Sequence, residues 1–233
     1  MAEPRRTGGG ATATRTAKQR AQYQRPTTTV RTDRSGKADI NSGLTPAQQR
    51  AVTAWEDKNR DFKTEHTVLV DEQGRIDPRG KVQVGSGSSS RARISSAAMV
   101  ENGVLTHNHP SNSTGDIAGR VGVPLSGQDV WVAAKYNLKE VRAVSPHYTY
   151  SVRRPAGGWP SGWSGFSREF QQIADREARS MFTDTMRVLN ANGGVTRNDA
   201  DVYNNRINTV ASHRAMQAMA KKYGFTYTRR RTR

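Results

Sequence analysis

The sequence predicts an α/β (α+β) protein in which short strands and helices precede a long helical hairpin. Short apolar stretches bounded by turn residues alternate with helical patterns from residue 44 to 155. Apolar residues then recur at intervals of three and four between residues 166 and 223, as in amphipathic helices. Residues 1–43 are polar and basic, and they cannot bury enough apolar surface to become ordered. The 233 residues therefore suit one domain of moderate size with tails.

The first elements are expected just after this basic arm. Thr45 is a suitable N-cap, and Pro46 a suitable first residue, for a helix that runs to about Phe62. The apolar run at 67–70 is typical of a buried strand, and the turn after it begins a return strand. Further short extended pieces are expected in residues 81–95, around a loop rich in Gly and Ser.

A second strand, expected at 103–106, delivers His107 and His109 at its end. Side chains two positions apart in a strand lie on the same side, so the two imidazoles form a chelating pair. A polar loop with several glycines follows at 111–124, and a helix is expected at 126–137.

The next pattern predicts a hairpin and then a break in the chain. Residues 139–144 alternate with period two, and residues 148–152 are the expected antiparallel partner. The Gly/Pro/Trp-rich segment 153–165 marks a domain boundary. Trp159 and Trp163 are expected to pack over the sheet edge, and stacking on nucleic-acid bases beside neighbouring arginines is the alternative.

Two long helices complete the chain as a helical hairpin. Asn192-Gly193-Gly194 ends the first helix, Thr196 begins the second, and Gly224 ends it. The expected units are a disordered basic arm (1–43), a domain with its leading helix (44–155), a linker (156–165), the helical hairpin (166–228) and a basic tail (229–233).

The composition favours partners that carry negative charge. The net charge is +17 and the sequence pI is about 10.9, which favours DNA, other polyanions or acidic proteins. Solubility alone is the competing explanation. Residues 1–43 carry nine Lys or Arg against three Asp or Glu, and residues 229–233 add four arginines. Much of the charge therefore lies in two basic tails.

The composition also excludes several classes of site. The chain has no cysteine, so disulfides and thiolate ligands are excluded, and a metal site must use histidines and carboxylates. Only 33% of the residues are hydrophobic, and the mean hydropathy is −0.83. No apolar run approaches the roughly 18 residues of a membrane span, and the N-terminus lacks the apolar segment of a signal peptide. We therefore expect no membrane contact.

The best-defined chemical feature is a set of three metal ligands. Hydrolytic zinc sites use three protein ligands and one water. His107 and His109 provide two imidazoles, and Asp129, one turn into the following helix, provides a carboxylate. Asp116 in the polar loop is the rival carboxylate. A helix holds a ligand more rigidly than a loop, which favours Asp129, and Zn²⁺ is the expected cofactor.

Two further residues complete a hydrolytic site. A general base must take a proton from the attacking water, and Glu65, directly before the first strand, is the candidate. Glu56, Glu72 and Glu101 are less well placed. Ser126 is the candidate donor to the developing oxyanion, although Ser-x-x-Asp is also typical of a helix N-cap with an acidic first turn.

The remaining histidines are expected outside this site. His66 points away from Glu65 if both are extended. His147 is expected in the hairpin turn, and His213 on the surface of the last helix or at an interface.

His107-Asn108-His109-Pro110-Ser111 together with Ser126-x-x-Asp129 resembles the JAB/MPN (JAMM) metalloprotease family, in particular its RadC-like branch. The resemblance covers about residues 60–155 and implies a mixed β-sheet flanked by helices. It implies that the two histidines and the aspartate bind zinc, that Glu65 is the acid/base, and that the serine stabilises the tetrahedral intermediate. The interval between the two motifs is longer than usual in the family, so residues 111–124 are expected to be an insertion.

A looser likeness connects other segments with JAB-like domains of bacteriophage head-morphogenesis and other mobile-element proteins. It rests on Glu140–Val144, Tyr150–Pro155, Gly158–Pro160 and Ala220–Phe225. It implies phage capsid or portal proteins as partners, and the cytoplasm of a bacterial host or the virion as the location.

Three functions follow as competing hypotheses. The first is a zinc-dependent peptidase or isopeptidase that acts on a protein or peptide substrate. The second is a phage structural protein that binds DNA or capsid components through its basic tails. The third is a metal-dependent nuclease, which is less favoured because phosphodiesterases usually gather more carboxylates around their metals.

Overall fold

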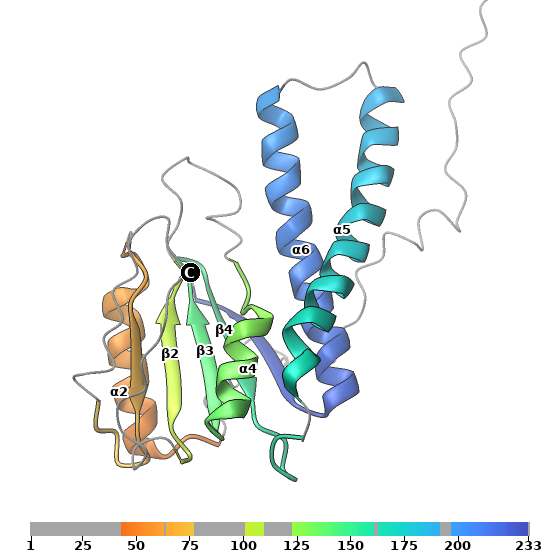
Figure 1. The fold of residues 1–233 in the computed structure, drawn as a ribbon. Coiled ribbons are helices and arrows are strands. Elements are labelled where there is room, and N and C mark those ends of the chain that lie inside the picture. Colours follow the sequence, from red (N-terminus) through yellow and green to blue (C-terminus); the bar gives the residue numbers. More distant parts are fainter. Residues whose placement is uncertain are drawn as a thin grey trace, which may run out of the picture.

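The computed structural model describes residues 43–62, 64–76, 101–109, 123–160, 163–191 and 197–232. The basic arm, the extended pieces expected at 81–95 and most of the 111–124 loop lie outside these residues. In chain order the elements are α2 (Pro46–Asn59), β1 (Thr67–Val70), β2 (Val104–Asn108), α4 (Gly127–Lys135), β3 (Glu140–Val144), β4 (Tyr148–Arg153), the short 3₁₀ helix η2 (Trp163–Gly165), α5 (Phe166–Ala191), α6 (Arg197–Tyr223) and β5 (Thr226–Arg231) (Figure 1).

The strands form one mixed sheet in the order β1-β2-β3-β4-β5. β2 and β3 run parallel, with α4 as the connection between them, and the other neighbouring strands are antiparallel. The expected α/β class, with a mixed sheet flanked by helices, is therefore confirmed. Carboxyl ends of parallel strands meet at one edge of a sheet, so β2, β3 and β5 all end at the same edge.

The sheet has two differently covered faces (Figure 1). On one face, Val52 of α2 packs on Val68, Val70 and Val104. On the other face, α4 and the lower half of the α5–α6 hairpin cover the main core. This core joins sheet and helix residues that include Leu69, Leu105, Val141, Val130, Phe166, Phe170, Met216 and Met219. No helix in the described part of the chain is both long and apolar enough to cross a membrane.

Helix α2 begins as the sequence predicts and ends earlier. The Thr45 side chain accepts a hydrogen bond from the backbone N–H of Gln48, and the Gln48 side chain accepts one from the backbone N–H of Thr45. Pro46 follows the cap. The helix ends at Asn59 and not near Phe62. The reason is the next residue, Arg60, whose buried guanidinium donates to the Ser145 carbonyl at 2.7 Å and so turns the chain toward the sheet edge.

A buried ionic cluster lies between α2 and the sheet. The period-two pattern of β3 predicts one exposed face, but every residue of this strand is buried. The Arg142 guanidinium lies 2.7 Å from Glu56 of α2 and 3.4 Å from Glu140. The Thr106 hydroxyl donates to Glu56 at 3.0 Å. Burial raises the pKa of Glu56, and the charge of Arg142 opposes this shift, so the cation favours the charged carboxylate.

Replacing Arg142 by Met is expected to lower the free energy of unfolding by about 3–5 kcal/mol, because Glu56 then stays buried without the cation it contacts, and Glu140 keeps only Arg153, at 3.4 Å. Urea unfolding followed by circular dichroism measures this change. Arg187→Met is the control, since Arg187 pairs with Asp184 on the exposed side of α5. Its expected effect is below about 1 kcal/mol. Equal losses in both variants would show that the ionic cluster carries no special weight.

The helical hairpin shares its core with the sheet domain. α6 ends where Gly224 adopts a φ of +76°, as the sequence predicts. Trp159 donates to the Leu138 carbonyl at 2.8 Å, and Trp163 stacks on Tyr223. The segment expected as a linker at 156–165 therefore packs on the core, and the predicted packing role of its tryptophans is what the structure shows.

The expected basic tail at 229–233 is wrong for most of its length. Residues Thr226–Arg231 form β5, which pairs with the whole of β4. The strand begins with Thr226, Tyr227 and Thr228, residue types that favour strands, and the ring of Tyr227 is buried under α6. The arginines then continue the pairing because β4 offers them an open edge.

His213, expected on the surface of the last helix or at an interface, is partly buried and faces β5. Its Nδ1 lies 2.8 Å from the Tyr227 hydroxyl, and its Nε2 lies 2.9 Å from the Gln217 side chain. Burial, together with the positive charges of Arg229 and Arg214, lowers the pKa of His213 to about 4. The side chain is therefore neutral inside the fold at neutral pH.

This low pKa predicts a pH-dependent stability. The pKa of His213 lies below its ordinary value of 6.5, so the unfolded chain takes up the proton first. The stability that depends on neutral His213 is complete above about pH 6.5 and is lost as the pH falls to about 4. Between about pH 7.5 and 4.5, the wild-type protein should lose about 2 kcal/mol more than His213→Gln. Urea unfolding at both pH values tests this, and identical losses in the two proteins would contradict it.

Candidate metal centre

The two predicted histidine ligands stand at the carboxyl end of β2. His107 is the fourth residue of the strand and is buried, while His109 follows the strand and is partly exposed. Both side chains project to the sheet face that α4 covers, because residues two apart in a strand share a face. The expected strand was 103–106, so the observed strand extends far enough to hold His107 itself.

Each imidazole is held by a backbone group on its outer side. Nδ1 of His109 lies 2.8 Å from the Val123 carbonyl, and the ring of His107 hydrogen-bonds to the backbone of Arg142 in β3. The two Nε2 atoms face each other at 2.9 Å. A neutral imidazole that donates through Nδ1 has a lone pair on Nε2. Two lone pairs at this distance repel unless a proton or a cation lies between them.

Asp129 brings a carboxylate to the same point. It lies in the first turn of α4, and its Oδ1 is 3.6 Å from Nε2 of His107. Its Oδ2 accepts hydrogen bonds from the backbone N–H and the hydroxyl of Ser126, both at 2.7 Å. The three ligand atoms of His107, His109 and Asp129 all lie within 4.8 Å of one another. This group could hold a metal ion.

The protonation states suit metal ligands. Burial lowers the pKa of His107 to about 4, although the negative charge of Asp129 opposes this shift. For Asp129, burial acts to raise the pKa, but His107, His109 and the two Ser126 hydrogen bonds together hold it below its usual value. A neutral imidazole and an ionised carboxylate are the forms that bind metals.

Glu65 lies beside this group without belonging to it. Thr67 pairs with His107 in the antiparallel β1–β2 register, and continuing that register places Glu65 beside His109. Burial raises the pKa of Glu65, the charge of His109 lowers it, and the charge of Asp129 raises it. These effects require Glu65 to be close to both groups.

The other predicted candidates lie elsewhere. Glu56 belongs to the buried ionic cluster, and the turn with Glu72 and the residue Glu101 stand at the opposite end of the sheet from the histidines. The ring of His66 turns to Phe62 and to the Thr64 hydroxyl. His147 lies in the turn between β3 and β4, as expected. Asp116 lies outside the described residues.

Ser126 has the structural role that the sequence left open. It is the N-cap of α4, and its hydroxyl accepts from the Asp129 backbone N–H at 3.2 Å. The capping box therefore fixes the side chain of Asp129. Sequence reasoning missed the carbonyl of Val123 and the backbone of Arg142, which orient the two imidazoles. Backbone groups carry no residue-type signal, so only the sheet register and the start of α4 reveal them.

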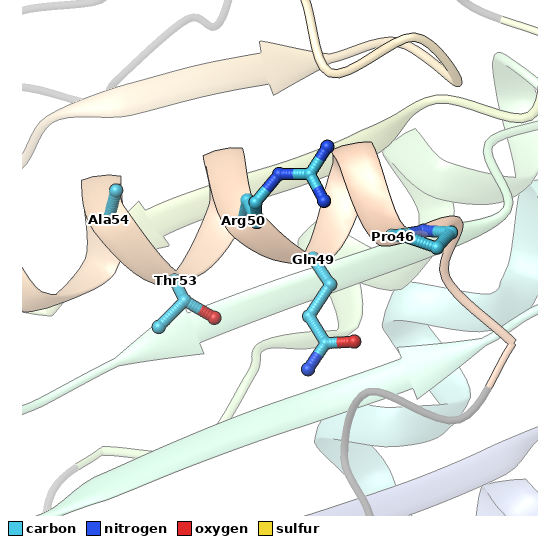
Figure 2. Close-up of a pocket in the computed structure, with 5 residues that line it drawn as sticks. All are labelled: Pro46, Gln49, Arg50, Thr53 and Ala54. Atoms are coloured by element: carbon cyan, nitrogen blue, oxygen red, sulfur yellow. The ribbon is translucent and has the colours of Figure 1, made fainter.

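The hollow shown in Figure 2 is a separate feature. It lies on the outer surface of α2, on the sheet face opposite the histidines, and Pro46, Gln49, Arg50, Thr53 and Ala54 line it. These side chains include no pair of titratable groups and no metal-ligand set. We therefore place the candidate site at the carboxyl end of β2 and not in this hollow.

No family model, curated protein or solved structure matches the chain. The candidate site therefore rests on its own geometry.

The geometry predicts about one divalent ion per chain, bound by three protein ligands. The double variant His107→Ala/His109→Ala is expected to lose this ion because only Asp129 remains. Elemental mass spectrometry of the untagged protein, loaded with zinc and then passed over a desalting column, measures the content. His66→Ala is the matched control and should keep the ion, since its ring faces Phe62 and Thr64. Equal metal content in the double variant and the wild type would contradict the assignment.

Proposed function

We propose that the protein is a zinc-dependent peptidase or isopeptidase of the JAMM type. His107, His109 and Asp129 would hold the ion, and Glu65 would act as the general base. The observation that supports this most is the facing pair of imidazole nitrogens, closed on one side by Asp129 and flanked by Glu65.

The donor set fits zinc. Two imidazole nitrogens and one carboxylate oxygen, with no thiolate, match the ligand classes of catalytic zinc sites. Oδ2 of Asp129 is engaged by Ser126, which leaves Oδ1, the oxygen nearer to His107, for an ion. When bound, zinc would lower the pKa of a water molecule toward about 7 and polarise the carbonyl of the substrate.

Glu65 is suited to move the proton. The register places it next to His109, and it is partly exposed, so a water molecule can reach it. As general base it accepts a proton from the attacking water and then delivers this proton to the leaving amine. Its partial burial favours the protonated form, which helps the second step, in which Glu65 acts as an acid.

Ser126 has two roles in this proposal. In the fold it orients Asp129 through the capping box. Its hydroxyl donates a hydrogen bond to Oδ2 of Asp129, so the hydroxyl must rotate away from that oxygen to donate to the oxyanion. The backbone N–H of Ser126 also donates to Oδ2 and keeps the carboxylate in place during such a rotation.

The second hypothesis, binding of DNA or capsid components through basic tails, gains no support at the C-terminal end. Arg229, Arg230 and Arg231 belong to β5 and not to a free tail. The likeness to phage proteins adds no residue to the site, and phage partners and a virion location are left as sequence-based expectations.

The proposal predicts that Glu65→Gln separates metal binding from catalysis. The variant should keep its zinc, because Glu65 is not a ligand, while its cleavage rate should fall at least a hundredfold, on the order of a lost general base. The probes are a proteome-derived peptide library and a panel of isopeptide-linked lysine peptides. New termini are counted by mass spectrometry, and zinc is measured on the same samples.

Glu101→Gln is the matched control. It makes the same chemical change at an exposed carboxylate before β2, at the other end of the strand, and should leave cleavage unchanged. Cleavage at the wild-type rate by Glu65→Gln, or zinc-loaded wild-type protein that cuts neither peptides nor isopeptides, would overturn the proposal.

A further inference from the structure

The sheet register aligns the metal centre with residues on the far strands. His107 of β2 pairs with Ala143 of β3, Ala143 with Tyr150 of β4, and Tyr150 with Arg229 of β5. Directly paired residues project to the same face of a sheet. Arg229 therefore lies on the same face of the sheet as His107, in the same line of directly paired residues.

The side chain of Arg229 packs against the neighbouring strand β4. Its guanidinium lies 5.1 Å from the centre of the Tyr148 ring, and Tyr148 belongs to β4, one strand nearer to the histidines. The guanidinium also hydrogen-bonds to the Tyr150 hydroxyl. Cation–π contact and a hydrogen bond together hold the group in one place. The side chain is only partly buried, so a ligand can reach it.

Arg229 has no carboxylate partner within the described part of the chain. Its neighbours are the two tyrosine rings and, on α6, the neutral His213. A guanidinium that is fixed in position and not neutralised by the protein is suited to recognise an anion in two-point geometry. Arg231, the partner of Tyr148, adds positive charge on the same face.

β3 lies between the two groups. Its residue on this face, Ala143, is buried in the main core, so a peptide that joins the two groups must pass beyond it, at the carboxyl end of β3. The guanidinium lies over β4, which is two strands away from β2. Two strand spacings are about 10 Å. An extended peptide covers this distance in about three residues.

We propose that Arg229, fixed by Tyr148 and Tyr150, binds a carboxylate of the substrate about three residues from the bond that is cut. This inference rests on the proposed peptidase function and names its substrate class: peptides with an acidic side chain, or a free C-terminal carboxylate, at that distance. Arg229 is thus a specificity-determining residue and takes no part in the bond-breaking step.

Peptide binding to the zinc-loaded full chain carrying Glu65→Gln tests this without depending on cleavage. The probes are short fluorescent peptides, amidated at the C-terminus, in which one glutamate moves through a Ser/Ala background, each with a glutamine counterpart. Fluorescence anisotropy should give about tenfold tighter binding for glutamate at one position, as expected for a charge-assisted hydrogen bond. A second set without glutamate compares free and amidated C-termini, and a free-terminus preference that needs Arg229 also supports the proposal.

Arg230 supplies the control within the same strand. It is the next residue of β5 and projects to the opposite face, so Arg230→Gln removes the same charge away from the site. Arg229→Gln should abolish the glutamate preference and Arg230→Gln should keep it. Arg229→Lys keeps the charge without the two-point geometry and should retain only part of the preference. It also gives a result if the Gln variant does not fold.

Each other outcome overturns either the inference or the peptidase function. Equal loss of preference in the two Gln variants would mean that net charge alone attracts the peptides. Single-stranded DNA that loses affinity in Arg229→Gln only, while peptides show no preference, would assign the group to nucleic acid. Wild-type cleavage without any glutamate or C-terminal preference would overturn the inference and leave the peptidase function standing. A preference that depends on Arg229 in a protein that cuts nothing would overturn the peptidase function and leave the anion-binding role of Arg229 standing.

Discussion

The parallel pairing of β2 with β3 is the constraint on which the candidate metal centre depends. It sets His107 beside Arg142 and Ala143, so the backbone of Arg142 can hold the His107 ring. It also requires the chain to cross back along the sheet, and α4 makes this crossing. The N-terminal turn of α4 therefore lies at the carboxyl end of β2, and Asp129 meets the histidines there. One pairing thus brings together ligands that are far apart in the sequence.

Charges buried on the opposite face protect this register. A slip of one residue would exchange the two faces of β3 and place Arg142 among the apolar residues of the main core. Arg142 pairs with Glu56 on the side of α2, and the Thr106 hydroxyl holds the same carboxylate. The desolvation of an isolated guanidinium makes any register that exchanges the two faces costly. The ionic cluster therefore favours a register in which His107 faces α4.

Local signals predicted the fold well, and tertiary signals were missed. Thr45 with Pro46, Gly224, and the two-residue spacing of the histidines each act through neighbouring backbone, so the sequence alone reveals them. The burial of Arg142 could not be predicted because it depends on α2, a helix distant in the chain. β5 was missed because three consecutive arginines are typical of a solvated tail, whereas the open edge of β4 decides their conformation.

The charge of Asp129 and the charge of Arg229 are opposite, and β3 lies between them. When the imidazoles are neutral, the three-residue ligand group carries only the charge of Asp129, and it attracts a cation. Arg229 would repel that cation if it stood on β3, but its guanidinium lies over β4, across the small side chain of Ala143. At about 10 Å, close to one Debye length at physiological salt, this repulsion is weak. The proposed cation site and the proposed anion site would therefore not weaken each other.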